Sequence, residues 1–141
     1  AQLLEEMAVL HKTELSGNDI QLKISVYPED LTVAADKHMI DQVLINLIKN
    51  AIQSFDEQSD ARIIELRGAL SEKSRPVISV RDNGQGIDPE AMEKIFIPFF
   101  TTKKSGSGIG LSLSRQIMRK HHGTLSVKSS PGSGTEFLMR F

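Results

Sequence analysis

The chain has 141 residues, the size of one ordinary domain, and its 39% hydrophobic and 25% charged residues are typical of a folded globular chain. Its formal charge of −1 excludes a basic field for general nucleic-acid binding and a polybasic stretch for a lipid surface. The absence of cysteine excludes disulfides, thiolate metal sites and a cysteine nucleophile.

The sequence carries no targeting signal that we recognise. Its apolar runs fall short of the roughly 18 residues that cross a bilayer, and the N-terminus lacks the basic-then-apolar plan of a signal peptide. We therefore expect a cytoplasmic domain without direct membrane contact. Because the chain begins at Ala1, we also expect a longer parent protein, for which a membrane anchor stays open.

The first part of the chain predicts a helix, two strands and a long helix. Residues 1–15 carry apolar side chains at helical spacing, at Leu3, Leu4, Met7, Leu10 and Leu15. Strict alternation predicts a half-buried strand over 20–26, and a second short strand is expected over 31–35. Asp36 is expected to cap a helix that runs to about Phe55.

The remainder alternates strands with shorter helices. Strands are expected over 63–70, 77–82, 124–129 and 136–141. Asp88, Pro89 and Glu90 open a short helix with a cap, a proline in the first turn and an acid at the positive end. Another helix is expected over 109–121. Grouped strands with helices between them predict one α/β domain, in which helices cover one face of a mixed sheet.

The long helix carries amides on the side opposite its apolar residues. Asn46, Asn50 and Gln53 are spaced i, i+4, i+7, so they share one edge of the helix. Asparagine is a mediocre helix former, and a solvated face is the simpler interpretation. The alternative is a need for neutral oxygen ligands beside an anion and a hard cation such as Mg²⁺.

Two glycine-rich segments also have two interpretations each. Residues 82–87, DNGQGI, follow a strand and form either an Asn-Gly hairpin or a loop that lets Asp82 face a flat ligand while Gly84 and Gly86 allow close backbone approach. Residues 106–111, GSGIGL, form either a flexible loop or a phosphate site at a helix start. They match neither the dinucleotide nor the Walker pattern.

Taken in order, these segments resemble the catalytic ATP-binding domain of sensor histidine kinases. The resemblance spans about residues 20–141. Its motifs are an asparagine box at 46–51, a first glycine box at 82–87, a phenylalanine box at 96–103, a second glycine box at 106–111 and a closing glycine-threonine motif at 134–137. It implies the Bergerat ATP-binding fold, a two-layer α/β sandwich, with ATP and Mg²⁺ as cofactors.

The resemblance also implies roles for individual residues. Asn50 would bind Mg²⁺ with Asn46 beside the phosphates, and Asp82 would hold the adenine amine with support from Thr135. Residues 96–108 would form a lid. Gln53 replaces a basic residue of many relatives, which leaves a phosphate contact to Lys103 or Lys104 unless these are exposed loop charges. The expected nucleotide-binding set is Asn46, Asn50, Gln53, Asp82, Gly84, Gly86, Ile87, Phe99, Thr101, Thr102, Lys103, Gly106, Ser107, Gly108, Ile109, Gly110, Leu111 and Thr135.

The residue type at Asn46 helps to distinguish ATP hydrolysis from phosphoryl transfer to a histidine. Hydrolases and serine kinases of this fold typically carry a glutamate there as general base, whereas a neutral imidazole is nucleophilic without losing a proton. We therefore expect transfer of the ATP γ-phosphate to a histidine, with an ATP hydrolase or a non-catalytic partner-binding module as alternatives. The four histidines of the chain are interpreted as structural or surface residues.

The resemblance also implies partners and a domain division. The acceptor histidine would lie on a dimerising helical hairpin of the same protein or of its dimer mate, and a response regulator would receive the phosphoryl group. Residues 1–16 are interpreted as a helical stub at the end of that hairpin, and residues 17–141 as the ATP-binding catalytic domain.

Overall fold

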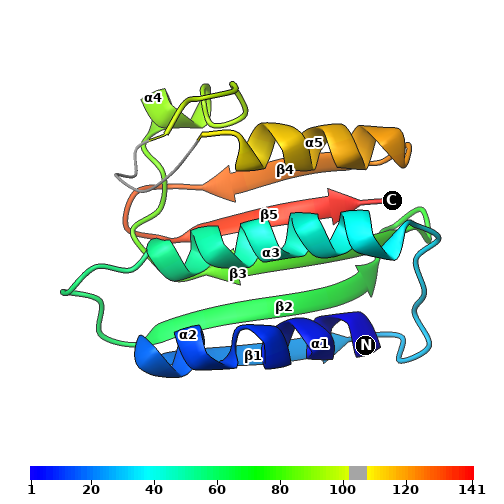
Figure 1. Ribbon diagram of the computed structural model, residues 1–141, viewed down its shortest axis with the longest axis horizontal. Coiled ribbons are helices and arrows are strands. Elements are labelled where there is room, and N and C mark those ends of the chain that lie inside the picture. Colours follow the sequence, from blue (N-terminus) through cyan, green and yellow to red (C-terminus); the bar gives the residue numbers. More distant parts are fainter. Residues whose placement is uncertain (102–107) are drawn as a thin grey trace.

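The computed structural model describes residues 1–101 and 108–141. Within these residues, one mixed sheet has the strand order β1-β2-β3-β5-β4 (Figure 1). Its strands are β1 (Ile20–Val26), β2 (Arg62–Leu70), β3 (Pro76–Asp82), β4 (Thr124–Ser129) and β5 (Thr135–Arg140). β1 runs parallel to β2, and every other neighbouring pair is antiparallel.

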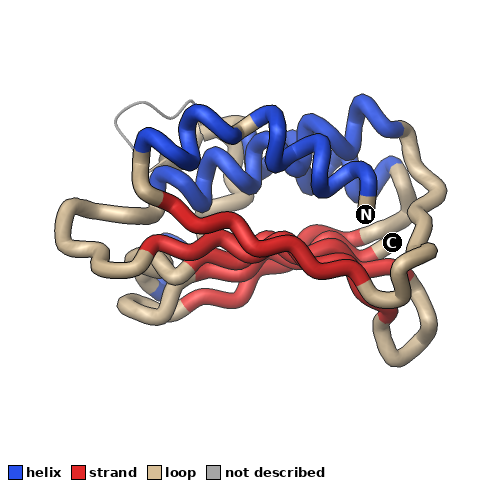
Figure 2. Tube along the Cα trace, turned by 90° about the horizontal axis from the view of Figure 1, so that it is seen from below, coloured by secondary structure: helices blue, strands red, loops and turns tan. Residues whose placement is uncertain are grey.

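The long helices all cover the same face of this sheet. Figure 2 shows the sheet edge-on, with α1, α2, α3 and α5 on one side of it. The helices are α1 (Gln2–Leu10), α2 (Lys12–Gly17), α3 (Lys37–Gln53), α4 (Pro89–Met92) and α5 (Gly110–Lys120). This arrangement confirms the predicted two-layer α/β sandwich. In the described part of the chain, none of the helices combines the length and apolar character that a bilayer crossing requires.

α3 lies at the centre of the helical layer, because its apolar arc faces the sheet. Six apolar residues of this helix are buried, namely Ile40, Val43, Leu44, Leu47, Ile48 and Ala51. Asp36 caps the helix as expected, since its Oδ1 accepts a hydrogen bond from the Met39 N–H at 3.1 Å. The sequence alone therefore predicted both the start of this helix and the face that it buries.

The strand expected over residues 31–35 is wrong. These residues form an irregular connection between β1 and α3, without strand structure. Leu31, Val33 and Ala35 alternate with exposed residues, and the last two pack against the core. The alternation therefore reflects half-burial of a connecting segment, which produces the same sequence pattern as a strand.

The single N-terminal helix is also wrong in detail. α1 ends at Leu10 and α2 begins at Lys12, with His11 between them. Leu10 is 59% exposed, whereas His11 is 2% exposed and its Nδ1 lies 2.9 Å from the Met7 carbonyl oxygen. Because of this break, His11 lies on the buried side of the helices and Leu10 does not. Leu4 and Met7 join the core as expected.

Candidate functional site

Asn46, the first amide of the row on α3, lies against the start of α5. Asn46 and Asn50 are half-buried, and Gln53, one turn further, is exposed. Asn46 Nδ2 donates a hydrogen bond to Ser114 Oγ at 3.3 Å, and Ser114 Oγ donates to the Gly110 carbonyl oxygen at 2.8 Å. The first amide of the row therefore belongs to a polar contact between two helices rather than to a wholly solvated face.

Gly110 makes this contact possible. A Cβ added at Gly110 would lie 2.0 Å from Asn46 Oδ1, a separation that a real side chain does not tolerate. The glycine therefore brings the first turn of α5 directly against the Asn46 side chain. The first backbone N–H groups of α5, which have no hydrogen-bond partners within the helix, therefore lie next to the Asn46 carboxamide.

A second polar group lies where β3 ends. Asp82 is only 4% exposed, and its Oδ1 accepts a hydrogen bond from the Gly84 N–H at 2.9 Å. It stands opposite Thr135 of β5, which is 6% exposed. Thr135 Oγ1 and Ser129 Oγ lie 2.9 Å apart. A carboxylate and two hydroxyl-bearing side chains are thus gathered on the helix-covered side of the sheet.

The loop after β3 is shaped by its glycines and does not form a hairpin. A Cβ at Gly84 would lie 2.2 Å from Ser54 Oγ, just beyond the end of α3. Gly86 has a φ of +78° and lies against the Ser130 carbonyl. The Ile87 N–H donates to Ser129 Oγ at 2.9 Å before the chain enters α4. The loop is therefore enclosed between α3 and the β4–β5 turn.

Two described residues between α4 and α5, Phe99 and Gly108, contact each other. The Phe99 N–H donates to the Gly108 carbonyl oxygen at 2.8 Å, and both residues have positive φ, +69° and +75°. Of the residues predicted here, Phe99, Thr101 and Ile109 are exposed and Leu111 is half-buried. Thr102, Lys103, Gly106 and Ser107 lie outside the described residues, as does Lys104.

Arg115 of α5 packs against Phe96, which lies between α4 and α5. Its guanidinium carbon lies 3.5 Å from the centre of the Phe96 ring, and its Nη2 donates to the Leu125 carbonyl oxygen at 3.3 Å. Removal of the guanidinium from solvent lowers the pKa of Arg115. One side chain therefore joins α5, β4 and the residues that precede Phe99.

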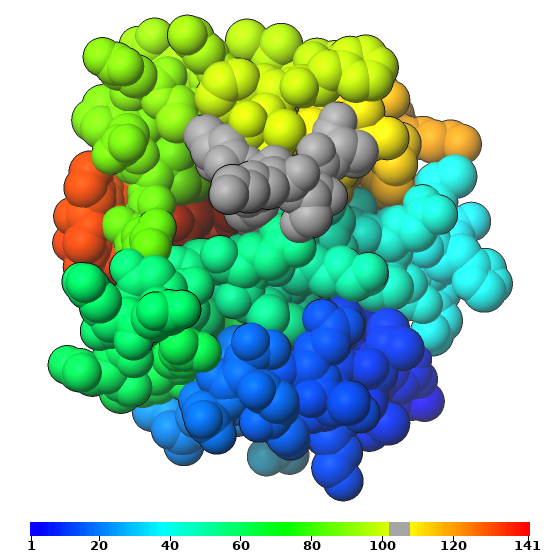
Figure 3. Space-filling model, turned by 60° about the vertical axis from the view of Figure 1, so that its left-hand side comes forward, coloured from blue at the N-terminus to red at the C-terminus, as the bar shows by residue number. Residues whose placement is uncertain are grey.

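Figure 3 shows a hollow in the surface, with β5 in red at its bottom, between α3 and the green segment that follows β3. Asp82 and Thr135 belong to the strands beneath this region, and Gly84 abuts the end of α3. Asn46 and Gly110 meet further back along α3. The loop after Asp82 therefore meets the C-terminal end of α3, and the start of α5 meets α3 at Asn46.

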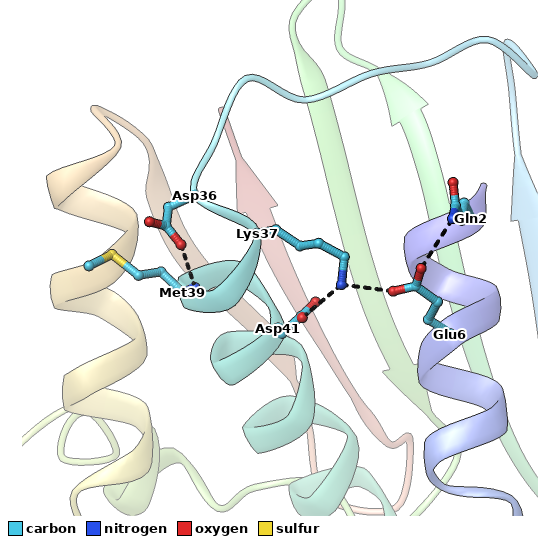
Figure 4. Close-up of polar contacts among 6 residues, drawn as sticks. All are labelled: Gln2, Glu6, Asp36, Lys37, Met39 and Asp41. Atoms are coloured by element: carbon cyan, nitrogen blue, oxygen red, sulfur yellow. Dashed lines mark hydrogen bonds and ion pairs between the residues drawn. The ribbon is translucent and has the colours of Figure 1, made fainter.

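The opposite end of α3 is tied to α1 (Figure 4). Lys37 Nζ lies 2.8 Å from Glu6 Oε2 of α1 and 3.0 Å from Asp41 Oδ2 of α3. The hydrogen bond from Lys37 lowers the pKa of Glu6 and contributes most to the raised pKa of Lys37 itself. The pair is exposed, so we expect it to orient α1 more than to stabilise the fold.

The donor set suits a cation shared with a nucleotide. Among the described residues, no three His, Cys, Asp or Glu side chains gather where they could hold a metal ion alone. Asn46 and Asn50 offer neutral oxygens instead, and Mg²⁺ takes oxygen ligands that include substrate phosphates and water. The residues present therefore fit a cation that arrives with its phosphate ligands.

The histidines occupy structural or surface positions. His11 is buried, and His121 Nε2 accepts a hydrogen bond from the Asp36 N–H at 3.0 Å. His121 Nδ1 lies 2.8 Å from the Ile117 carbonyl oxygen. His38 and His122 are exposed. The contacts of His121 fix the C-terminal end of α5 against the cap of α3.

Sequence reasoning missed four residues that build the site. Three are the serines that contact its predicted members, and one is Arg115: the set is Ser54, Ser114, Ser129 and Arg115. Only Ser114 carried a usable signal, because it lies four residues after Gly110 and so shares its helix face. The Ser54–Gly84 and Arg115–Phe96 contacts join segments far apart in the sequence, and the Ser129–Thr135 pair depends on the register between β4 and β5.

Comparison with known proteins agrees with this geometry. A family model described as "Histidine kinase-, DNA gyrase B-, and HSP90-like ATPase" matches residues 35–141. The chain belongs to this ATPase family. Within the family it is similar to the signal transduction histidine-protein kinase AtoS of Escherichia coli K12, with 38% identity over 97% of this chain and 22% of that protein.

Solved structures place this ATPase domain beside the catalytic domains of histidine kinases. The catalytic domain of histidine kinase ThkA matches with a TM-score of 0.86 and 34% identity, over 99% of this chain and 90% of that one. ThkA in complex with the response regulator TrrA matches at 0.80 with 32% identity, over 99% and 39%. Full-length ShkA in complex with AMPPNP matches at 0.85 with 28% identity, over 99% and 29%.

The match is to one part of larger kinases. The chain spans between about a fifth and a third of the curated relatives, 21% to 29% of their lengths, but nearly all of an isolated ThkA catalytic domain. The predicted resemblance to the catalytic domain of sensor histidine kinases is therefore confirmed.

Proposed function

We propose that this domain binds Mg²⁺-ATP and transfers the γ-phosphate to a histidine outside residues 1–141. The observation that carries the proposal is the placement of one buried carboxylate, Asp82, at the end of β3, below the helix that bears Asn46 and Asn50. The family of the chain and the ShkA complex with AMPPNP support an adenine nucleotide as the ligand.

The adenine end depends on Asp82. Its carboxylate accepts a hydrogen bond from the exocyclic amine of adenine, whereas guanine presents a carbonyl there and is rejected. Thr135, held by Ser129, supports this end, and Gly84 and Gly86 allow the backbone to approach the flat base. A charge-assisted bond of this kind contributes about 1.5–3 kcal/mol, enough to select one base over the other.

The phosphate end depends on Asn46, Asn50 and the start of α5. Asn50 would hold Mg²⁺ together with the phosphates, and Asn46, which contacts Gly110, would lie beside them with the amides that follow Gly110. When bound, the cation neutralises charge that develops on the transferred phosphoryl group. The contribution of Lys103 or Lys104 to this end is part of the same proposal.

Asn46 directs the reaction toward an imidazole. A carboxamide has no basicity with which to activate water or a hydroxyl, whereas a neutral imidazole attacks phosphorus without prior loss of a proton. What the domain must supply is position and charge stabilisation, while the acceptor arrives from another segment. We infer that histidine, and not water, is the acceptor.

The acceptor lies on a helical hairpin that precedes this domain, in the same protein or its dimer mate. We propose that residues 1–16 continue from this hairpin and that residues 17–141 form the catalytic unit. α1 and α2 pack against β1 and α3, so the junction is anchored to the domain rather than loose. A response regulator is the proposed final acceptor, as the ThkA complex with TrrA suggests.

The proposal is tested with the preceding hairpin restored. The protein is incubated with Mg²⁺ and ATP labelled at the γ-phosphate, and the label is followed through acid and alkali treatment. We expect an acid-labile, alkali-stable phosphohistidine that disappears when the acceptor histidine is replaced. Steady phosphate release by residues 1–141 alone, without phosphohistidine, would instead indicate an ATP hydrolase.

A separate titration addresses the remaining alternative. Calorimetry of residues 1–141 with Mg²⁺-ATP should show saturable binding. If no heat of binding appears even at about millimolar nucleotide, the binding free energy is weaker than about 4 kcal/mol. This result would favour a partner-binding module with a vestigial nucleotide site.

A further inference from the structure

The face of the sheet opposite the helices has two different halves. Across one half, the strand register places charges of alternating sign side by side: Lys23 pairs with Glu65, Glu65 with Arg81, Arg81 with Glu136 and Glu136 with Lys128. Each charge in this row has an opposite charge on the neighbouring strand. This half of the face therefore compensates its own charge.

The other half, toward the β2–β3 turn, lacks this compensation. Arg67 has Ser25 and Ser79 as its neighbours in the register, and Arg140 has Val77 and Thr124. The turn adds two more exposed cations, Lys73 and Arg75. Within the described residues, none of these four cations has a carboxylate oxygen within ion-pair distance.

These cations border a hollow of about 660 Å³ on the outer face of the sheet. Its lining includes the apolar residues Ala69, Val77 and Leu138 together with four basic side chains. Ser79 belongs to this outer face, between Arg67 and Leu138 in the register, yet it is only 6% exposed. The hollow therefore has a recessed, partly apolar floor and a cationic border.

The turn that carries two of the cations is internally bonded. The Ser71 N–H donates to the Arg75 carbonyl oxygen at 2.8 Å, and the Ser74 N–H donates back to the Ser71 carbonyl oxygen at 2.9 Å. The Arg75 N–H also donates to Ser71 Oγ at 3.3 Å. These hydrogen bonds hold the backbone of the turn beside the hollow, whose lining includes Lys73 and Arg75.

We propose that this hollow, bordered by Arg67, Lys73, Arg75 and Arg140, docks an acidic segment of a partner protein. Carboxylates of the segment pair with the uncompensated cations while its apolar side chains cover Ala69, Val77 and Leu138. The surface lies on the face of the sheet opposite the helices and Asp82. It is therefore independent of the proposed nucleotide site.

A protein segment fits this surface better than a polyphosphate or a lipid surface. Glu72 and Glu136 also line the hollow, and they would repel a continuous row of phosphates. A mixed peptide can place its carboxylates on the cations and leave these two glutamates to a basic or neutral residue. The apolar floor likewise favours side chains over a sugar-phosphate backbone.

The test measures binding of a defined acidic peptide to residues 1–141. The probe is a fluorescein-labelled peptide in which Glu alternates with either Leu or Ser. In its counterpart, every Glu is replaced by Gln. The variant is Arg67→Gln with Arg75→Gln, and the matched control is Lys23→Gln, which removes one cation from the compensated half of the same face. Circular dichroism and affinity for Mg²⁺-ATP check that each variant folds.

We expect saturable binding of the Glu peptide and weaker binding of the Gln peptide. Each exposed ion pair changes an affinity about two- to fivefold, so the double variant should lose about tenfold while Lys23→Gln stays within about twofold. Salt of about 0.5 M should weaken the binding, because it shortens the screening length to about 4 Å. If the Arg67 substitution prevents folding, Lys73→Gln with Arg75→Gln, confined to the turn, should show the same loss.

Four results would overturn the proposal. They are no binding of the Glu peptide at about millimolar concentration, equal binding of the Gln peptide, an equal loss in Lys23→Gln, and equal or tighter binding of vesicles with anionic headgroups or of single-stranded DNA. The last result would assign the surface to a phosphate-bearing partner instead.

Discussion

Replacement of Asp82 by asparagine separates recognition of adenine from stability of the fold. Asp82 Oδ1 already accepts the Gly84 N–H at 2.9 Å, and the asparagine side chain keeps an oxygen that can accept the same bond. The substitution is isosteric, so we expect it to lower the free energy of unfolding by about 1 kcal/mol or less. The substitution therefore removes the negative charge and replaces the other carboxylate oxygen by an NH₂ group.

The expected loss of affinity follows from that change. The variant exchanges a carboxylate oxygen for an amide that donates toward the adenine amine, which is itself a donor. Loss of a charge-assisted bond of about 1.5–3 kcal/mol weakens binding of Mg²⁺-ATP about ten- to a hundredfold. Adenosine should lose a similar factor, because the missing bond is to the base and not to the phosphates.

Calorimetric titration with adenosine and with Mg²⁺-ATP measures both effects, and thermal unfolding reports on the fold. The matched control is Asp56→Asn, because Asp56 is another carboxylate beside this loop, where its Oδ2 accepts a bond from Gln85 Nε2 at 2.7 Å. We expect the control to bind ATP within about twofold of wild type. Affinity of Asp82→Asn within about threefold of wild type, in a folded variant, would remove Asp82 from the adenine pocket.

Three further predictions concern α3 and its neighbours. Asn50→Ala should weaken Mg²⁺-ATP much more than adenosine in the same titrations, because it removes an oxygen ligand of the cation. Gly110→Ala should destabilise the domain by about 1–3 kcal/mol in thermal or urea unfolding, because the added Cβ meets Asn46 Oδ1 at 2.0 Å. Lys37→Gln should lower the melting temperature only slightly near neutral pH, because the pair is exposed, and less still in acid, because protonation of Glu6 removes its charged partner in wild type as well.

Each of these predictions has its own control and its own refutation. Gln42→Ala, at an exposed amide of α3 outside the expected nucleotide-binding set, should leave Mg²⁺-ATP affinity nearly unchanged. Equal losses for adenosine and Mg²⁺-ATP in Asn50→Ala would refute the metal role. Gly17→Ala meets no atom within 4 Å, so it should not destabilise, and an equally harmless Gly110→Ala would contradict the close contact.

The pH prediction has a definite sign. The pKa of Glu6 is lowered in the folded state, so its contribution is present above the ordinary carboxyl pKa and is lost as the pH falls through the lowered value. The raised pKa of Lys37 keeps that group charged throughout this range. An effect of Lys37→Gln on melting temperature that is the same in acid as at neutral pH would rule out this ion pair as its cause.

The sequence by itself determined most of the local elements. Alternation and helical spacing fixed the main strands and the buried face of α3, since these patterns arise within one element. The order of Asn50, Asp82 and the glycine segments resembles that of sensor histidine kinases, and this resemblance indicated a nucleotide. Residues 31–35 and the break at His11 were mispredicted, because half-burial by another segment leaves the same pattern as a strand or a continuous helix.

Only the tertiary structure decided which residues touch across these elements. The Asn46–Gly110 contact, the Ser129–Thr135 pair and the Arg115–Phe96 stack join positions that no local pattern connects. The same holds for the outer face of the sheet, where compensation or exposure of a charge depends on strand register. Register and helix packing are set by the whole chain at once, because each buried face must match its partner.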